Sequence, residues 1–508
     1  MNLKRREFVK ISSLTAAGSL IIPPFLNSCN GTNLSDNAEL FLNHFEVSRE
    51  LLNKIISVAM EKGGDYADLY FEHTLRNTSA LEDGKVNSAY SNIGYGVGIR
   101  VLKGDQTGYA YSEDVTQEAI LKAARTAANI ADSQGTFSPV KVSEYLPPDY
   151  YSVRTSWENT SVKDKIPFVQ RMNDKIFAAD KRVSKVNVYL EDSSSRILYY
   201  NSQGLLACDY RPLVYLAGVC IMEDKGQIEN FFVGKSFRTG SEFLTNDLID
   251  SMSAEVVEKT SRLFNAGKPK AGEMEVVLGA GESGILLHEA MGHAFEADFN
   301  RKNLSIFSDK MGKKIAEDFV SIVDDGTIPG NRGTLNFDDE GNPTEKTVLV
   351  NNGILTSYLH DRISADYYKV NPTGNGRRES FRHIPMPRMR ITYMENGPHK
   401  KEEIIASVKN GIYVDSFSNG QVNIGQGDFT FFVKFGYIIE NGKLTKPIKD
   451  INIIGNGPQA LADIVMAADD MAINNGVWTC GKNGQGAPVS MGIPTVKIKK
   501  LTVGGLNA

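Results

Sequence analysis

The sequence predicts an α+β fold, with a mixed helix and sheet region on the N-terminal side and a strand-rich, antiparallel C-terminal domain. Apolar residues that recur at helical spacing, as they do after Leu51, indicate a small number of helices. Extended segments are separated by turn sequences such as Asp83-Gly84 and Asn441-Gly442, which are typical of hairpins. A chain of 508 residues exceeds one ordinary core, so several structural units are expected.

The first 28 residues are predicted to be an export signal. Paired arginines, Arg5-Arg6, precede an apolar run over residues 11–25 and a polar exit. The run is shorter than the roughly 20 apolar residues that cross a bilayer, and the arginine pair indicates the twin-arginine route. Residues 26–29 resemble a lipoprotein cleavage site in which Cys29 is lipidated. We therefore expect an exported protein, either periplasmic or anchored to the membrane as a lipoprotein.

Four further regions are expected after the signal. A stretch rich in Pro, Tyr and Ser at residues 136–155 and a short segment at 266–272 mark the boundaries. The regions are a tether at 29–44, an N-terminal α+β domain at 45–135, a middle domain of helices and antiparallel strands at 156–265, and a C-terminal domain at 271–508. Helices are predicted over residues 48–62, 116–131, 164–180, 244–264 and 459–472, with Pro167 in the first turn of the third.

Charge and cysteine content narrow the functional classes. The formal net charge is −5, so the chain lacks the basic footprint of a nucleic-acid-binding protein. Four cysteines are too few for a disulfide-built scaffold. Cys208 and Cys220 lie in one predicted extended stretch, roughly 40 Å apart, which is too far for a disulfide. Both are expected to be buried as small apolar residues.

The strongest chemical signal is an HExxxH motif, in which His288 and His293 flank Glu289 within a predicted buried helix over residues 281–296. Histidines four residues apart share one face of a helix. At about 100° per residue, histidines five apart diverge by about 140°. They can share a metal ion only if the helix widens by one residue or ends there, and Gly292 would tolerate either distortion. The alternative is a pair of structural histidines with an incidental glutamate.

A catalytic zinc site has three protein ligands and leaves the fourth position for water. Two histidines therefore require one more ligand. Spacing alone leaves four candidates open, namely Glu296, Asp298, His383 and Cys480.

Other polar residues are weighed against simpler structural roles. Arg377 and Arg378, in a glycine-rich loop, could hold a substrate carboxylate or stabilise an oxyanion, or they could anchor the loop. His383 could stabilise the transition state as a hydrogen-bond donor, could contact a metal ligand from behind, or could be an ordinary core histidine. The remaining histidines are expected at the surface: His44, His73, His360 and His399.

Several sequence blocks together resemble the TldD/PmbA metallopeptidase family. They follow the family's order and cover the chain from about residue 273 to its C-terminal part, while residues 68–72 and 96–100 match more loosely. The HExxxH motif is similar to that of the TldD-type catalytic subunit, because PmbA-type (TldE) partners lack it. The blocks lie at residues 288–293, 296–301, 323–327, 338–343, 372–380, 383–388 and 477–482.

The resemblance implies a zinc site held by His288, His293 and Cys480, with Glu289 as the catalytic carboxylate. It also implies hydrolysis of unfolded or extended peptides, and a dimer formed with a second copy or with a PmbA/TldE-type subunit. Family members usually act in the cytoplasm, so the export signal is a departure. The alternatives are a chaperone-like binding protein with a structural metal, or a metal-dependent hydrolase of a non-peptide amide.

Overall fold

The computed structural model describes residues 38–505 apart from residues 134, 136, 139 and 424. The predicted export signal, Cys29 and residues 29–37 of the predicted tether lie outside the described residues. The α+β fold is confirmed, since helices and mainly antiparallel sheets share the chain. Among the described helices, none has the length and apolar character that a membrane span requires.

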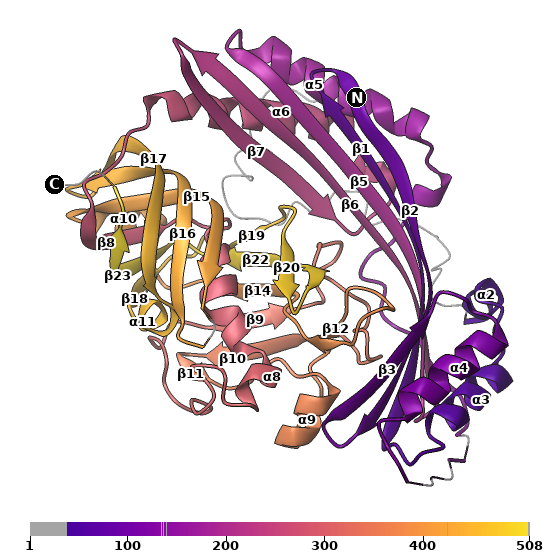
Figure 1. Cartoon of the computed structure of the whole chain (residues 1–508). Helices are drawn as coiled ribbons and strands as arrows, with labels where there is room; N and C mark the ends of the chain where they lie inside the picture. The colour runs from indigo at the N-terminus through magenta and orange to yellow at the C-terminus, as the bar shows by residue number, and fades with distance from the viewer. Residues whose placement is uncertain (1–37, 134, 136, 139, 424, 506–508) are drawn as a thin grey trace.

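The regions predicted as N-terminal and middle domains contribute strands to a single long, curved sheet of seven strands (Figure 1). The strand order is β3-β2-β1-β5-β6-β4, and β7 pairs with β6. The link between the regions is the antiparallel β1–β5 pair, which runs from Asp68 opposite Asn201 to Glu82 opposite Asn187. The strands are β1 (Tyr66–Glu82), β2 (Lys85–Lys103), β3 (Gln106–Ser112), β4 (Ser143–Tyr145), β5 (Val183–Asn201), β6 (Leu205–Asp224) and β7 (Gln227–Phe237).

Helices cover this sheet near its two ends and create two separate apolar cores (Figure 1). One core lies under α2 (Ala38–His44), α3 (Arg49–Ala59) and α4 (Gln117–Ala128). The other lies under α5 (Val162–Ala179) and α6 (Asn246–Arg262).

Helix α5 begins earlier than the sequence predicts. Ser161 and Asp164 form a capping box that starts the helix at Val162. Pro167 therefore lies beyond the first turn, where its missing N–H removes one helical hydrogen bond. The prediction that Pro167 falls in the first turn is wrong because the helix was predicted to begin at residue 164, whereas it begins at Val162.

The C-terminal region is built from two six-stranded sheets and two short hairpins. Pairing is mainly antiparallel, but β8–β15 and β14–β22 are parallel. The first sheet, in the order β17-β16-β15-β8-β23-β18, contains β8 (Gly272–Leu278), β15 (Asn410–Val422), β16 (Asp428–Glu440), β17 (Lys443–Asn456), β18 (Ile464–Ala467) and β23 (Val496–Val503). The second, in the order β11-β10-β9-β14-β22-β19, contains β9 (Ile322–Asp325), β10 (Lys346–Asn351), β11 (Ile354–Leu355), β14 (Ile391–Met394), β19 (Ala472–Asn474) and β22 (Ser490–Ile493). The hairpins are β12 (Gly376–Arg377) with β13 (Met386–Pro387), and β20 (Thr479–Lys482) with β21 (Gln485–Pro488).

Two expectations for single segments are wrong. The helix predicted over residues 459–472 is only α11 (Gly457–Ala462), and β18 follows it. The β-branched pair Ile464-Val465 favours a strand, and β18 pairs with β23. His360, expected at the surface, is buried with 4% exposure, and its ring packs edge-on against the rings of Tyr358 and Tyr368. Two shorter helices complete this region, α9 (Arg362–Tyr368) and α10 (Lys401–Ala406).

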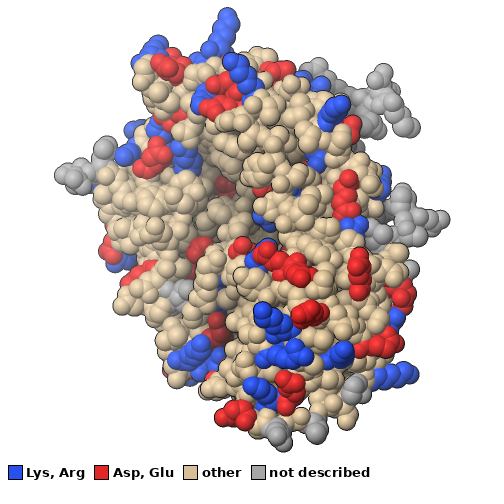
Figure 2. Space-filling view, turned by 45° about the vertical axis from the view of Figure 1, so that its right-hand side comes forward, with Lys and Arg blue, Asp and Glu red and all other residues tan. Residues whose placement is uncertain are grey.

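Two observations agree with the expectations from composition. Cys208 and Cys220 are buried, unpaired thiols on β6. On the face drawn in Figure 2, basic and acidic side chains are interspersed, and the surface is hollowed near its middle.

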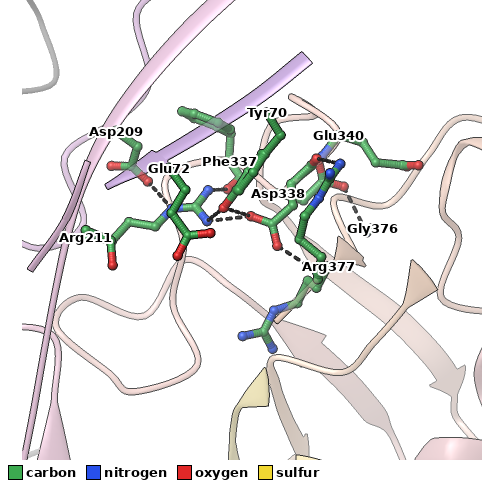
Figure 3. A network of polar contacts seen from close by, with 12 residues as sticks. Tyr70, Glu72, Asp209, Arg211, Phe337, Asp338, Glu340, Gly376 and Arg377 are labelled. Atoms are coloured by element: carbon green, nitrogen blue, oxygen red, sulfur yellow. Dashed lines mark hydrogen bonds and ion pairs between the residues drawn. The ribbon is translucent and has the colours of Figure 1, made fainter. Parts of the chain in front are cut away.

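Buried charges fasten the long sheet to the C-terminal region (Figure 3). Arg211 of β6 forms ion pairs with Asp209 on its own strand and with Asp339 of the C-terminal region. The same guanidinium donates a hydrogen bond to the carbonyl of Phe337 at 2.9 Å. Tyr70 of β1 donates to Asp339 at 3.1 Å. Each carboxylate in this group thus has a cation or a hydroxyl as partner, as buried charges require.

A second set of buried contacts also joins the long sheet to the C-terminal region. Arg100 of β2 pairs with Asp68 of β1 and, at 2.6 Å, with Glu340. Next to Glu340, Asp338 accepts a hydrogen bond from the backbone N–H of Gly376 at 2.9 Å, which positions the β12–β13 hairpin. Burial, together with the nearby carboxylate of Glu340, raises the pKa of Asp338 above its usual range.

We predict that Arg211→Met strongly destabilises the protein. The substitution leaves Asp339 and Asp209 buried without their shared cation, and removing one partner of a buried pair costs about 3–5 kcal/mol. The measurement is the urea midpoint followed by tryptophan fluorescence. The half-exposed pair Arg171–Asp250 provides the matched control. Arg171→Met should leave the midpoint nearly unchanged, because Asp250 keeps Lys175 and water as partners. Equal midpoints for the two variants would contradict this account of the network.

Candidate metal centre

The histidine-bearing segment changes helix type along its length. After β8, the chain forms α7 (Gly284–Leu287) and then widens into the π-helical turn η5 (His288–Gly292). It tightens into the 3₁₀ turn η6 (His293–Phe295) and continues into α8 (Ala297–Asn300). The wider turn adds a residue, which is the distortion that the five-residue spacing requires. The two imidazole rings consequently lie with their centroids 5.1 Å apart.

Gly292 serves this segment by packing rather than by backbone freedom. Its φ of −59° is ordinary helical geometry that any residue adopts. A Cβ at this position, however, would lie 2.1 Å from Sδ of Met389. The sequence suggested that a glycine is needed here because it tolerates a distorted backbone. The structure gives a different reason: a side chain at this position would collide with Met389.

The segment is held in place by the apolar core of the C-terminal region. Leu286, Leu287, Ala290 and Met291 are buried in a cluster that includes strands of both six-stranded sheets. This packing fixes which face of the widened turn carries the histidines.

Three side chains that can bind a metal converge at this point. Cys480 lies on β20, 187 residues beyond His293, and its Sγ is 3.3 Å from Nε2 of that histidine. One donor atom from each of His288, His293 and Cys480 lies within 4.8 Å of the other two. All three residues are buried. The fold thus brings together Cys480 and the two histidines.

The other candidate ligands are engaged elsewhere. Glu296 contacts the far side of His293, with Oε2 3.0 Å from Nδ1. Asp298 accepts a hydrogen bond from Lys482 at 2.7 Å. His383 lies 3.1 Å from the hydroxyl of Ser380 and does not join the donor cluster formed by the described residues.

The charges of the cluster favour a thiolate. Burial alone would raise the pKa of the Cys480 thiol, but His288 and His293 outweigh it and lower the pKa to about 4. For His293, burial would lower the pKa, while Glu296 and Cys480 raise it well above its ordinary value. Burial would also raise the pKa of Glu296, but Lys482 and His293 bring it down to about 2.

This donor set fits zinc. Thiolate and imidazole are preferred zinc ligands, and three of them match a catalytic site. The Nδ1 atom of His288 is buried and has no hydrogen-bond partner among the described residues. A buried nitrogen in that condition is costly unless it has a partner absent from the protein itself. The cluster therefore suits a bound metal ion.

Glu289 differs from its neighbours in exposure. It is partly exposed, whereas His288 and Ala290 on either side are buried. No residue of the described chain donates a hydrogen bond to its carboxylate. The carboxylate is thus available to a water molecule or a substrate.

The two arginines are held by protein groups. Arg377 donates to the carbonyls of Met389 and Pro488 at 2.6 and 2.8 Å. Arg378 lies over the ring of Tyr70. Its backbone N–H donates to the carboxylate of Asp339 at 2.8 Å, and its guanidinium donates to the backbone carbonyl of Asp339 at 2.9 Å. These contacts match the anchoring alternative that the sequence left open.

Two residues near the cluster were not singled out from the sequence. Arg388 donates to the carbonyl of Cys480, and Lys482 contacts Glu296 and Asp298. The position of Lys482, two residues after Cys480 in a predicted turn and strand region, could have indicated that it lies near the site. Side chains two residues apart in a strand share one face, so Lys482 lies on the same face as Cys480.

Comparison with known proteins places this chain in a class of metal-dependent proteases. Family models described as the PmbA/TldA metallopeptidase domain 1, central domain and C-terminal domain match residues 67–131, 156–264 and 271–505. A "Metalloprotease TldD homolog" of Haemophilus influenzae is 38% identical over 93% of this chain and 100% of its own length. A "Zinc metalloprotease TldD homolog" of Saccharolobus solfataricus is 29% identical over 89% and 99%.

Solved structures share the fold. A proposed modulator of DNA gyrase from Thermotoga maritima superposes with a TM-score of 0.72 at 23% identity, over 89% of this chain and 99% of that one. TldE from Thermococcus kodakarensis superposes with a TM-score of 0.69 at 19% identity, over 90% and 100%. The chain is a metallopeptidase. It belongs to the PmbA/TldD family.

We predict that Cys480 is a thiolate at neutral pH in metal-free protein. A lowered pKa means that the ionised form persists as pH falls, until protonation near pH 4. Burial raises the pKa of Cys220 to about 11 and raises that of Cys208 as well, so both remain thiols. Ultraviolet absorbance of the thiolate, titrated from pH 8 downward, measures this. Cys480→Ser is the control and should abolish the signal. A thiolate signal that disappears near the ordinary cysteine pKa would contradict the prediction.

Proposed function

We propose that this chain is a zinc peptidase in which His288, His293 and Cys480 bind the metal and Glu289 is the general base. The observation that carries the proposal is the convergence of these three buried donors from two distant segments. Nδ1 of His293 lies 3.0 Å from the carboxylate of Glu296. Metal-binding histidines usually have such a hydrogen-bond partner on the ring nitrogen that does not bind the metal.

The number of donors favours a catalytic over a structural metal. A structural zinc normally has four protein ligands. Within the described chain, the cluster contains three His, Cys, Asp or Glu side chains. Glu296 and Asp298, the nearest alternatives, are paired with Lys482. A fourth position is therefore left for water, which counts against a purely structural or chaperone-like metal protein.

The mechanism then follows from the positions of the side chains. When bound, zinc would polarise the substrate carbonyl and lower the pKa of the attacking water. Glu289 accepts the proton from that water and delivers it to the leaving amine. As the direct neighbour of His288, Glu289 projects in a different direction around the helix and does not compete as a ligand. Its partial exposure and lack of a protein donor leave its carboxylate available for this exchange.

The substrates we propose are unfolded or extended peptides. This class rests on the family relationship. A non-peptide amide would be cut by the same chemistry, so substrate assays must compare a peptide with an amide of matched leaving group.

We predict that Glu289→Gln retains zinc but loses peptide cleavage by about 10²- to 10⁴-fold, the usual contribution of general acid–base catalysis. The amide keeps the size of the side chain but cannot accept a proton. Cleavage of an unfolded peptide and zinc content are measured on the same preparation. Cys480→Ser provides the converse case, because a neutral hydroxyl replaces an anionic soft ligand and zinc content should fall strongly. Wild-type cleavage by zinc-loaded Glu289→Gln would exclude Glu289 as the base.

Partner and location follow the same reasoning. We propose a dimer, formed with a second copy or with a PmbA/TldE-type subunit; TldE is among the proteins that share the fold. Light scattering of the active protein tests the dimer.

We further propose that the chain is exported through its twin-arginine segment and anchored at Cys29. Cell fractionation of wild type and Cys29→Ala tests the anchor, since the variant should leave the membrane fraction.

A further inference from the structure

The proposed ligands come from two elements that only tertiary structure brings together. His288 and His293 lie on the widened helix, while Cys480 lies on the β20–β21 hairpin. A metal site needs these elements at a fixed separation. The contacts of Lys482 link these two elements.

Lys482 is a buried cation with three acceptors. Its side chain is 3% exposed and begins two residues after Cys480. The Nζ atom lies 2.7 Å from Oδ1 of Asp298, 3.1 Å from Oε2 of Glu296 and 3.0 Å from the carbonyl of Pro387. An ammonium group has three donors, so these acceptors can use all of them. The two carboxylates belong to the histidine-bearing segment, which Lys482 thereby joins to its hairpin.

Glu296 extends this connection to a ligand. Its Oε2 atom lies both 3.1 Å from Lys482 and 3.0 Å from Nδ1 of His293. A hydrogen bond from Nδ1–H to the carboxylate fixes the ring's tautomer and leaves Nε2 as the ligand atom. That nitrogen is the one that lies beside Sγ of Cys480. A continuous line of contacts thus runs from Lys482 through Glu296 to the metal-facing side of His293.

We propose that Lys482 is a positioning residue that, through Glu296 and Asp298, fastens the cysteine hairpin to the histidine segment and preorganises the site for zinc. The inference rests on the ligand set proposed above. Lys482 acts on the proposed ligands indirectly, through Glu296 behind His293 and through the hairpin that carries Cys480.

The hairpin has other attachments, so the ammonium of Lys482 can be removed without undoing the fold. Arg388 donates to the carbonyls of Cys480 and Gln485. Arg332 donates to the carbonyl of Trp478 at 2.8 Å and to Oγ1 of Thr479 at 3.0 Å. These bonds hold the β20–β21 hairpin and the residue before it, whereas Lys482 contacts the carboxylate behind His293.

The test substitution is Lys482→Met, which keeps an apolar side chain of similar length and removes the charge. Its matched control is Lys500→Met, because Lys500, on β23, forms an exposed pair with Glu273 of β8. Zinc affinity is measured by competition with a chromophoric chelator. Loss of a group that orients a ligand typically weakens metal binding by about 10- to 100-fold. We expect that loss for Lys482→Met and wild-type affinity for Lys500→Met.

A cobalt spectrum separates positioning from general stability. Co²⁺ bound by a thiolate and two imidazoles gives absorption bands that depend on ligand geometry. We expect the bands of Lys482→Met to shift or weaken while its circular dichroism stays native. Glu296→Gln should weaken zinc binding in the same direction, and the double variant should lose less than the sum of the two single losses, because both act on one line of contacts.

The outcomes separate this inference from the proposed function. If Cys480→Ser keeps full zinc occupancy, the proposed ligand set is wrong. If Cys480→Ser loses zinc but Lys482→Met binds zinc and cobalt as the wild type does, the ligand set stands and the positioning role of Lys482 is overturned. If Lys482→Met does not fold, Glu296→Gln decides, and its wild-type zinc affinity would overturn the proposal.

Discussion

The metal centre depends on one extra residue in one helical turn. A regular α-helix would direct His288 and His293 to different sides, but the π-helical turn His288–Gly292 brings their rings together. Such a turn is less favourable than a regular one and needs support from its surroundings. The support comes from buried apolar side chains that pack against both C-terminal sheets, and from the close approach of Met389 to Gly292. Packing thus sets the geometry, and the geometry makes the proposed zinc chemistry feasible.

Charge plays a second, separate part in the architecture. The long sheet meets the C-terminal region through buried ion pairs made by Arg211 (Figure 3) and by Arg100. The metal centre has a separate charged group beside it, formed by Glu296, Asp298 and Lys482. Buried ion pairs contribute little net stability, because desolvation offsets their attraction, but they penalise any arrangement that separates the partners. They are therefore suited to defining one relative position of two segments.

Local sequence patterns predicted the features that depend on local structure. The hairpin turns at Asp83-Gly84 and Asn441-Gly442 occur where expected, with both glycines at positive φ, and the distorted helix followed from the spacing of two histidines. Contacts between distant residues could not be derived in this way. Four candidates for the third ligand had equal standing by spacing, and only the folded hairpin brings Cys480 to the histidines. The burial of His360 was missed for a related reason, since a single residue in a loop has no periodicity to reveal its environment.

The seven-stranded sheet has a consequence for how this protein can be divided. The family models end one domain at residue 131 and begin the next at 156, yet β1 and β5 pair along nearly their whole length across that boundary. A fragment that ended in the linker would expose the full edge of β1, with a row of unpaired backbone groups. Long exposed edges recruit other strands, so such a fragment would tend to aggregate rather than fold alone. The domains that the family models delimit are therefore not separate folding units in this chain, because both contribute strands to one sheet.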